Sequence, residues 1–189
     1  MTFYMGIDQS YTSTGVVVLN HDKEIIATRI ISTAPADGDA FQRSWSIINE
    51  IQNLVKIYAP ETIGLEGLAY AKFGDATRDL AGLQFGIVHR LRFVDDQHLV
   101  IVTPNELKKF GSGKGNADKK KMVDSLPKAV LKYFEAQGYK KTKGLYDITD
   151  AYWIARYVLE KTKVKPAPTE TKVVIPPRTE SSEKVDLTR

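Results

Sequence analysis

Residues 3–19 read FYMGIDQSYTSTGVVVL. Apolar residues alternate up to a lone aspartate, Asp8, and small and hydroxylated residues then lead into a run of valines. The pattern predicts two strands, over residues 2–9 and 13–20, joined by a short turn. A carboxylate buried at a strand end is costly unless it is paired, hydrogen-bonded or bound to a metal. Asp8 therefore needs a partner from elsewhere in the chain.

The remaining elements alternate in type. We predict strands over residues 24–33, 62–68 and 98–104, and helices over residues 39–58, 75–93, 103–111, 117–138 with a break at Pro127, and 147–161. Thr103 is the expected N-cap of the third helix, with Pro104 at its first position. The segment GSGKGN, residues 111–116, reads as a flexible glycine loop. These elements predict an α/β fold with a mixed five-stranded sheet, three antiparallel strands plus two parallel, flanked by helices.

Composition excludes several classes of protein. The chain has 189 residues and no cysteine, which rules out disulfides and thiolate metal sites and is typical of a reducing cytoplasm. No run of about 18 apolar residues exists to span a membrane. The first ten residues lack the basic start and apolar core of a signal peptide. We therefore expect a cytoplasmic protein that makes no membrane contact.

Charge is unevenly distributed along the chain. Residues 107–144 contain eleven lysines and three acidic residues, whereas the formal net charge of the whole chain is +4. A basic stripe of this kind indicates contact with nucleic acid, although a plain solvated surface stays an alternative. Residues 161–189 are basic and rich in Pro, Lys, Ser and Thr, and they lack the apolar content to fold. We predict one domain over residues 1–160 and a disordered tail over residues 161–189.

Four acidic residues are poorly explained by a structural role. Asp8 and Glu66 lie within apolar strand segments, and Asp147 and Asp150 are three positions apart at the start of the last predicted helix. Residues three apart share a helix face. All four converge if the first and fourth strands are adjacent and the last helix crosses their ends. Two structural alternatives stay open: Asp8 could bond the turn hydroxyls, and the DITD segment could be an acidic first helical turn.

Four carboxylates in one place repel each other unless cations lie among them. Mg²⁺ prefers hard oxygen ligands, and two such ions about 4 Å apart can activate a water and stabilise the leaving oxygen of a phosphodiester. We therefore expect Asp8, Glu66, Asp147 and Asp150 to bind two Mg²⁺ ions, for which Mn²⁺ can substitute. The three histidines show no zinc-binding spacing.

Four segments resemble motifs of the RuvC-type Holliday junction resolvases, which belong to the ribonuclease H-like nuclease superfamily. These segments are GIDQSYTSTGVVVL (6–19), IGLEGLAYAKF (63–73), GSGKGNADKKKMV (111–123) and DITDAYWIA (147–155). The resemblance covers roughly residues 3–160. It implies a ribonuclease H-like sheet and a homodimeric, Mg²⁺-dependent endonuclease that nicks two strands of a four-way DNA junction symmetrically. The helix near residues 76–93 would form much of the dimer interface, and no small-molecule substrate is expected.

The resemblance also implies roles for individual residues. Asp8, Glu66, Asp147 and Asp150 match the catalytic metal ligands, and Lys119 matches a lysine near the scissile phosphate. Lys108 matches a lysine near a neighbouring phosphate. The other DNA-binding lysines that we predict are Lys114, Lys120 and Lys121, which would contact backbone rather than bases. Cleavage would leave 5′-phosphate and 3′-hydroxyl ends without a covalent enzyme intermediate.

The chain also departs from the cellular family pattern. Gln9 and Ser10 stand where cellular members usually have proline and glycine, and Ala69 replaces an aromatic residue that stacks on an unpaired base. The neighbouring Tyr70 is the expected substitute for that stacking. These differences indicate a bacteriophage version that also cuts other branched DNA.

Three other functions share features with this sequence. A ribonuclease H-type enzyme that cuts RNA in hybrids would use the same acids, and a catalytically silent DNA-binding module could share the fold. The hairpin GIDQSYTSTG is also similar to a phosphate-binding hairpin of actin-like and sugar-kinase ATPases, but the length of the chain leaves no room for their second lobe. Junction affinity and dimerisation would distinguish a resolvase from a ribonuclease H.

Overall fold

The computed structural model describes residues 1–68 and 75–162. Tyr70 therefore lies outside the described residues, as does most of the predicted tail. The described part contains no helix that is both long and apolar enough to cross a membrane.

The described elements follow the predicted order. The strands are β1 (Phe3–Asp8), β2 (Thr14–Asn20), β3 (Ile25–Ile31), β4 (Thr62–Glu66) and β5 (Leu99–Val102). The helices are α1 (Ala40–Tyr58), α2 (Asp75–Val88), α3 (Pro104–Ser112), α4 (Lys119–Asp124), α5 (Lys128–Ala136) and α6 (Leu145–Thr162). A short 3-10 helix, η1 (Pro35–Asp37), precedes α1, and α2 continues into a wider π-helical segment, η2 (His89–Val94).

The five strands form one mixed sheet in the order β3-β2-β1-β4-β5. β1 pairs antiparallel with β2, which pairs antiparallel with β3, whereas β1, β4 and β5 are parallel neighbours. This confirms the predicted ribonuclease H-like sheet. It also places the first and fourth strands side by side, as the proposed convergence of acids requires.

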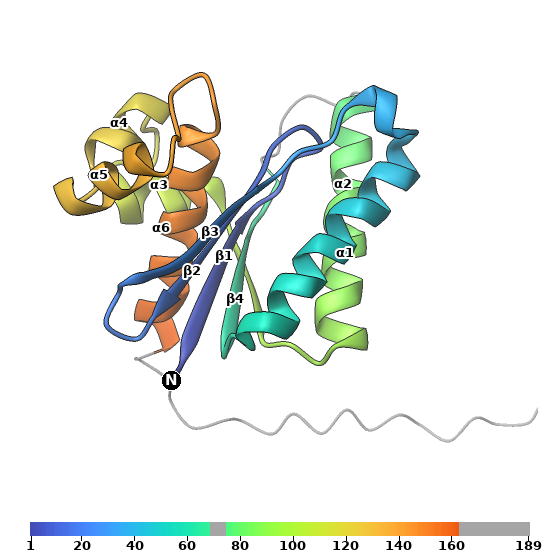
Figure 1. The fold of residues 1–189 in the computed structure, drawn as a ribbon, viewed down its shortest axis with the longest axis horizontal. Coiled ribbons are helices and arrows are strands. Elements are labelled where there is room, and N and C mark those ends of the chain that lie inside the picture. Colours follow the sequence, from blue (N-terminus) through green and yellow to red (C-terminus); the bar gives the residue numbers. More distant parts are fainter. Residues whose placement is uncertain (69–74, 163–189) are drawn as a thin grey trace, which may run out of the picture.

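Helices cover both faces of the sheet (Figure 1). α1 and α2 lie on one face, and α6 lies on the other together with α3, α4 and α5. Alternation along β1 explains the two cores: Tyr4 packs in the cluster with α6, while Met5 and Ile7 pack in the cluster with α1 and α2. By the same alternation Asp8 faces the α6 side.

Three glycines let α6 lie unusually close to the sheet. A Cβ on Gly6 would fall 2.1 Å from the carbonyl oxygen of Ala151, and one on Gly15 would fall 2.4 Å from the carbonyl oxygen of Asp147. A Cβ on Gly64 would likewise clash with the side chain of Ile154. The close approach fixes where the first turns of α6 lie relative to the strand ends.

Local signals set most helix ends, with some adjustments. Thr103 caps α3 through a reciprocal bond pair with Glu106, and Pro104 is its first residue, as predicted. The predicted glycine loop was wrong at its start, because α3 runs through Ser112 and ends where Gly113 adopts a left-handed φ of 79°. The last helix begins at Leu145, so Asp147 lies in its first turn.

Candidate active site

Asp8 and Glu66 lie at the ends of two adjacent parallel strands. Asp8 is the last residue of β1 and Glu66 the last of β4, and Ile7 of β1 lies opposite Leu65 of β4. Gly64 contacts α6 and Leu65 packs in the opposite core, so alternation turns Glu66 toward α6, as it does Asp8. The two carboxylates therefore share one edge and one face of the sheet.

The first two turns of α6 bring two further acids to this edge. Asp8 is paired with Gly15 across the hairpin, and the backbone of Asp147 lies directly over Gly15. Asp150 lines a cleft of about 330 Å³ together with Asp8 and Glu66. Asp147 is not among the residues that line this cleft, and its carboxylate accepts a hydrogen bond from the hydroxyl of Ser13 at 2.5 Å.

Burial and mutual repulsion disfavour ionisation of two of these acids. Burial, followed by the charge of Glu66 and a hydrogen bond with it, raises the pKa of Asp8 well above its ordinary value of 3.8. The charges of Asp150 and Asp147 add to this effect. Burial and the charge of Glu66 raise the pKa of Asp150 from 3.8 to about 7. Burial and the neighbouring carboxylates therefore both favour the neutral form of Asp8 and Asp150 in the metal-free protein.

Two lysines line the same cleft as the acids. Lys108 comes from α3 and Lys119 is the first residue of α4. Their positive charges act against the rise in the pKa of Asp150. Lys119 is exposed, and its ammonium lies 5.7 Å from the ring centre of Tyr146, which precedes Asp147. The structure therefore brings these two predicted DNA-binding lysines together with the acids.

The other predicted DNA-binding residues lie outside this cleft. Lys114 is exposed in the loop after α3, and Lys121 is exposed on α4. Lys120 is exposed as well, but its ammonium forms an ion pair with Asp124 at 2.6 Å. Tyr70, the predicted stacking residue, lies outside the described residues.

The donor set suits a divalent cation by its chemistry. Carboxylate oxygens are the ligands that Mg²⁺ prefers, and Asp8, Glu66 and Asp150 bring such oxygens to one cleft. Within the described ranges, no three or more His, Asp or Glu side chains already stand in the arrangement of a metal site.

Sequence reasoning missed the residues that contact these acids from the β1–β2 turn. The amide of Gln9 donates to the main-chain oxygen of Glu66 at 2.9 Å, and Ser13 donates to Asp147. Gln84 of α2 donates to the same Glu66 oxygen at 3.3 Å. The only signal in the sequence was that Gln9 replaces the usual proline of the cellular pattern, which says nothing of its partner.

An exposed aromatic stripe runs along α2 and η2. The rings of Phe85 and His89 lie 6.1 Å apart, and those of His89 and Phe93 lie 6.4 Å apart. Phe85 and Phe93 are each 72% exposed. Large apolar side chains exposed in a row are typical of a surface that contacts another protein.

Comparison with protein families gives one family match over most of the chain. The model described as crossover junction endodeoxyribonuclease RuvC matches residues 4–155. No curated protein sequence matches the chain.

Solved structures share the fold at low sequence identity. RuvC of Thermus thermophilus in complex with a Holliday junction substrate is 16% identical, with a TM-score of 0.67, covering 87% of this chain and 97% of that one. The Fowlpox virus resolvase in complex with substrate Holliday junction DNA is 14% identical, with a TM-score of 0.53, covering 87% and 100%. The yeast mitochondrial Holliday junction resolvase Ydc2 is 15% identical, with a TM-score of 0.55, covering 82% and 76%.

Proposed function

The chain belongs to the RuvC family of crossover junction endodeoxyribonucleases, and from this premise we propose how its cleft cuts a DNA junction. The observation that carries the proposal is the meeting of Asp8, Glu66 and Asp150 with Lys108 and Lys119 in one cleft. Family membership makes the chain a junction-resolving nuclease, and the cleft supplies both acidic and phosphate-attracting groups.

We assign the metal-binding role to Asp8, Glu66, Asp147 and Asp150. RuvC-type resolvases depend on divalent metal, and we propose two Mg²⁺ ions here, with Mn²⁺ as a substitute. When bound, such a pair supplies an activated water and stabilises the leaving oxygen of the phosphodiester. Asp8 and Glu66 lie on neighbouring strands and Asp150 lies on α6, so the main chain of each residue is in place before an ion binds.

The lysines of the cleft orient the DNA backbone in this proposal. Lys119, exposed at the rim beside Tyr146, receives the scissile phosphate, while Lys108 contacts a neighbouring phosphate. Each contact neutralises a phosphate and adds salt-dependent affinity. No protein nucleophile takes part, and the products carry 5′-phosphate and 3′-hydroxyl ends.

DNA outside the cleft would contact the exposed lysines that follow α3. Lys114 and Lys121 are available for phosphates, whereas Lys120 would first have to leave Asp124. We retain Tyr70 as the proposed stacking residue for an unpaired base. Four-way junctions are the proposed main substrate, with other branched DNA as further substrates.

Paired nicks require two active sites, so we propose a homodimer. The aromatic stripe of Phe85, His89 and Phe93 along α2 and η2 is the proposed interface. A two-fold dimer buries the same patch on both copies. The symmetry would then place one cleft on each of two equivalent junction strands.

The remaining assignments concern the organisation and origin of the chain. We propose that residues 1–160 form the nuclease domain and that residues 161–189 form a basic tail. Departures from the cellular pattern at Gln9, Ser10 and Ala69 favour a bacteriophage origin. Together with the absence of cysteine, this favours action in the cytoplasm of a bacterial host.

Cleavage of synthetic substrates tests the proposed function. The full chain is incubated with a four-way junction, a matched linear duplex and an RNA–DNA hybrid, each with Mg²⁺ and with chelator. We expect symmetric paired nicks in the junction, only with Mg²⁺, and little cutting of the duplex. Preferential cutting of the hybrid, or no cutting of any substrate, would contradict the proposal.

A further inference from the structure

The turn between β1 and β2 contacts two acidic residues that are distant in the sequence. Gln9 directly follows Asp8, and its side-chain nitrogen lies 2.9 Å from the main-chain oxygen of Glu66, 57 positions further on. Ser13 lies at the other end of the turn, and its hydroxyl donates to the carboxylate of Asp147, 134 positions further on. One turn of the hairpin thus contacts the acids on both sides of Asp8.

Gln9 is not the residue that stability alone would favour. It is 6% exposed, and its side-chain oxygen is buried without a hydrogen-bond partner among the described residues. An unpaired buried acceptor lowers stability, and a methionine of similar shape would avoid that cost. What the glutamine does provide is the bond to Glu66, whose main-chain oxygen also accepts a bond from Gln84 of α2 at 3.3 Å.

Hydrogen bonds between residues of the turn stabilise the conformation that carries Gln9 and Ser13. The hydroxyl of Thr14 donates to the main-chain oxygen of Ser10 at 2.5 Å and accepts a bond from the main-chain nitrogen of Ser10 at 3.1 Å. The main-chain nitrogen of Thr12 donates to the hydroxyl of Ser10 at 3.2 Å. A turn with these internal bonds can hold the groups that it contacts.

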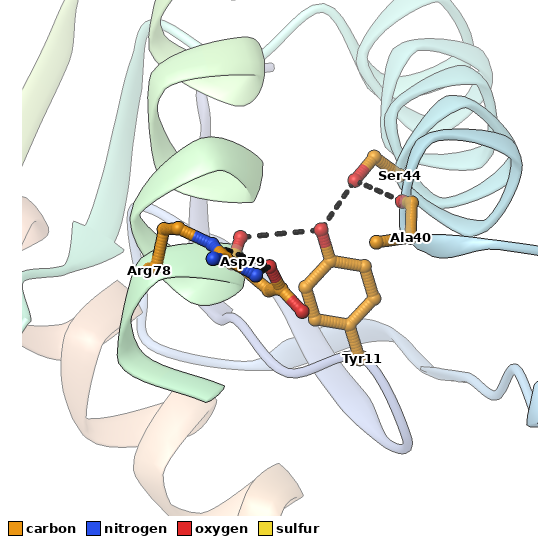
Figure 2. A network of polar contacts seen from close by, with 5 residues as sticks. All are labelled: Tyr11, Ala40, Ser44, Arg78 and Asp79. Atoms are coloured by element: carbon orange, nitrogen blue, oxygen red, sulfur yellow. Dashed lines mark hydrogen bonds and ion pairs between the residues drawn. The ribbon is translucent and has the colours of Figure 1, made fainter. Parts of the chain in front are cut away.

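Tyr11 fastens the same turn to the helices on the opposite face of the sheet. Figure 2 shows its hydroxyl between α1 and α2, 2.6 Å from the hydroxyl of Ser44 and 3.2 Å from the main-chain oxygen of Asp79. Arg43 of α1 donates to the main-chain oxygen of Tyr11 at 3.0 Å, and its guanidinium lies 5.1 Å from the ring centre. The turn is therefore fixed relative to the whole sheet.

We propose that Gln9 and Ser13 are positioning residues for a divalent ion. Gln9 fixes the main chain of Glu66 by its bond to the main-chain oxygen, and Ser13 orients the carboxylate of Asp147. This inference rests on the proposed function of the acidic cleft. A carboxylate that binds a metal is commonly oriented by hydrogen bonds from a second layer of groups, as Asp147 is by Ser13, and loss of such a group costs about 10–100-fold in metal affinity or activity. Ser13 contacts one oxygen of Asp147, which leaves the other oxygen for the ion.

Metal titration of the DNA-free full chain tests the inference. Gln9→Met and Ser13→Ala each remove one bond, and Thr12→Ala, which removes an exposed hydroxyl of the same turn, is the matched control. Calorimetric titration with Mn²⁺ should show affinity about 10–100-fold lower for the first two variants and unchanged for the control. Junction cleavage should fall in parallel and recover at higher Mn²⁺. Ser13→Thr keeps the hydroxyl and should restore affinity.

Stability measurements separate positioning from a structural role. The melting temperature of Gln9→Met should stay close to that of the wild type, because removal of the unpaired oxygen offsets loss of the bond to Glu66. A lower melting temperature with unchanged Mn²⁺ affinity would overturn the inference, as would affinity equal to the control. If Gln9→Met fails to fold, Gln9→Leu, which also lacks the amide, provides the same comparison.

The proposed function can fail separately from this inference. If the wild type neither binds Mn²⁺ nor cuts a junction, or if Asp8→Asn cuts as the wild type does, the proposed function fails and the inference fails with it. If the wild type cuts, Asp8→Asn does not, and Gln9→Met and Ser13→Ala behave like Thr12→Ala, only the positioning role is refuted.

Discussion

Replacement of Asp150 by asparagine should change how the stability of the metal-free protein depends on pH. The unfolded chain releases the proton of Asp150 near pH 3.8, whereas the folded protein keeps it until about pH 7. Between these values the folded state holds more protons than the unfolded state, so the free energy of unfolding falls as pH rises. Asp150→Asn removes this contribution.

The size of the effect follows from the raised pKa. One pH unit corresponds to about 1.4 kcal/mol, and about two units separate pH 5 from the folded-state pKa near 7. The wild type should therefore lose up to about 3 kcal/mol more than Asp150→Asn between pH 5 and pH 8. For a chain of this size that difference corresponds to roughly 5–10 °C in melting temperature.

Urea unfolding at pH 5 and pH 8, in a buffer with chelator, measures the two slopes. Glu135→Gln, an exposed change on α5, is the matched control and should keep the slope of the wild type. Equal slopes for Asp150→Asn and the wild type would refute the claim that Asp150 is buried among other negative charges.

Three further substitutions test other parts of the structure. Gly15→Ala places a methyl group 2.4 Å from the main-chain oxygen of Asp147 and should lower the free energy of unfolding in urea by about 1–3 kcal/mol. In the control Gly82→Ala the methyl group meets no atom within 4 Å, so this variant should not be destabilised. Equal effects of the two substitutions would contradict the close approach of α6 to the sheet. Phe85→Glu should convert a dimer to monomers in sedimentation experiments without loss of helical circular dichroism, and an unchanged mass would contradict the proposed interface. Lys119→Gln should weaken junction binding and reduce the slope of log affinity against log salt by about 1, so an unchanged slope would exclude a phosphate contact.

Much of the fold was predictable because its signals are local. Alternation around Asp8 and Glu66 identified two buried strands that each carry a carboxylate, although both strands end earlier than predicted, at the acid itself. The spacing of Asp147 and Asp150 placed both on one helix. The helix start at Thr103 followed from capping chemistry that involves only neighbouring residues.

The contacts that hold the acids were not predictable from such signals. Gln9 and Ser13 bind partners 57 and 134 positions away, and no periodicity links them. The role of Gly15 likewise depends on a helix that passes over it more than a hundred residues later in the chain. Local pattern reveals which residues are chemically unusual, whereas tertiary packing decides which of them touch.

The central claim is that acids from β1, β4 and α6 jointly bind divalent ions that drive junction cleavage. Asp8→Asn tests it most directly, with cleavage and binding of a four-way junction measured on the same protein. We predict that cleavage in Mg²⁺ falls to the level of the wild type in chelator, while junction binding is kept or strengthened because a less acidic cleft repels phosphate less. Undiminished cleavage by a folded Asp8→Asn protein would contradict the account.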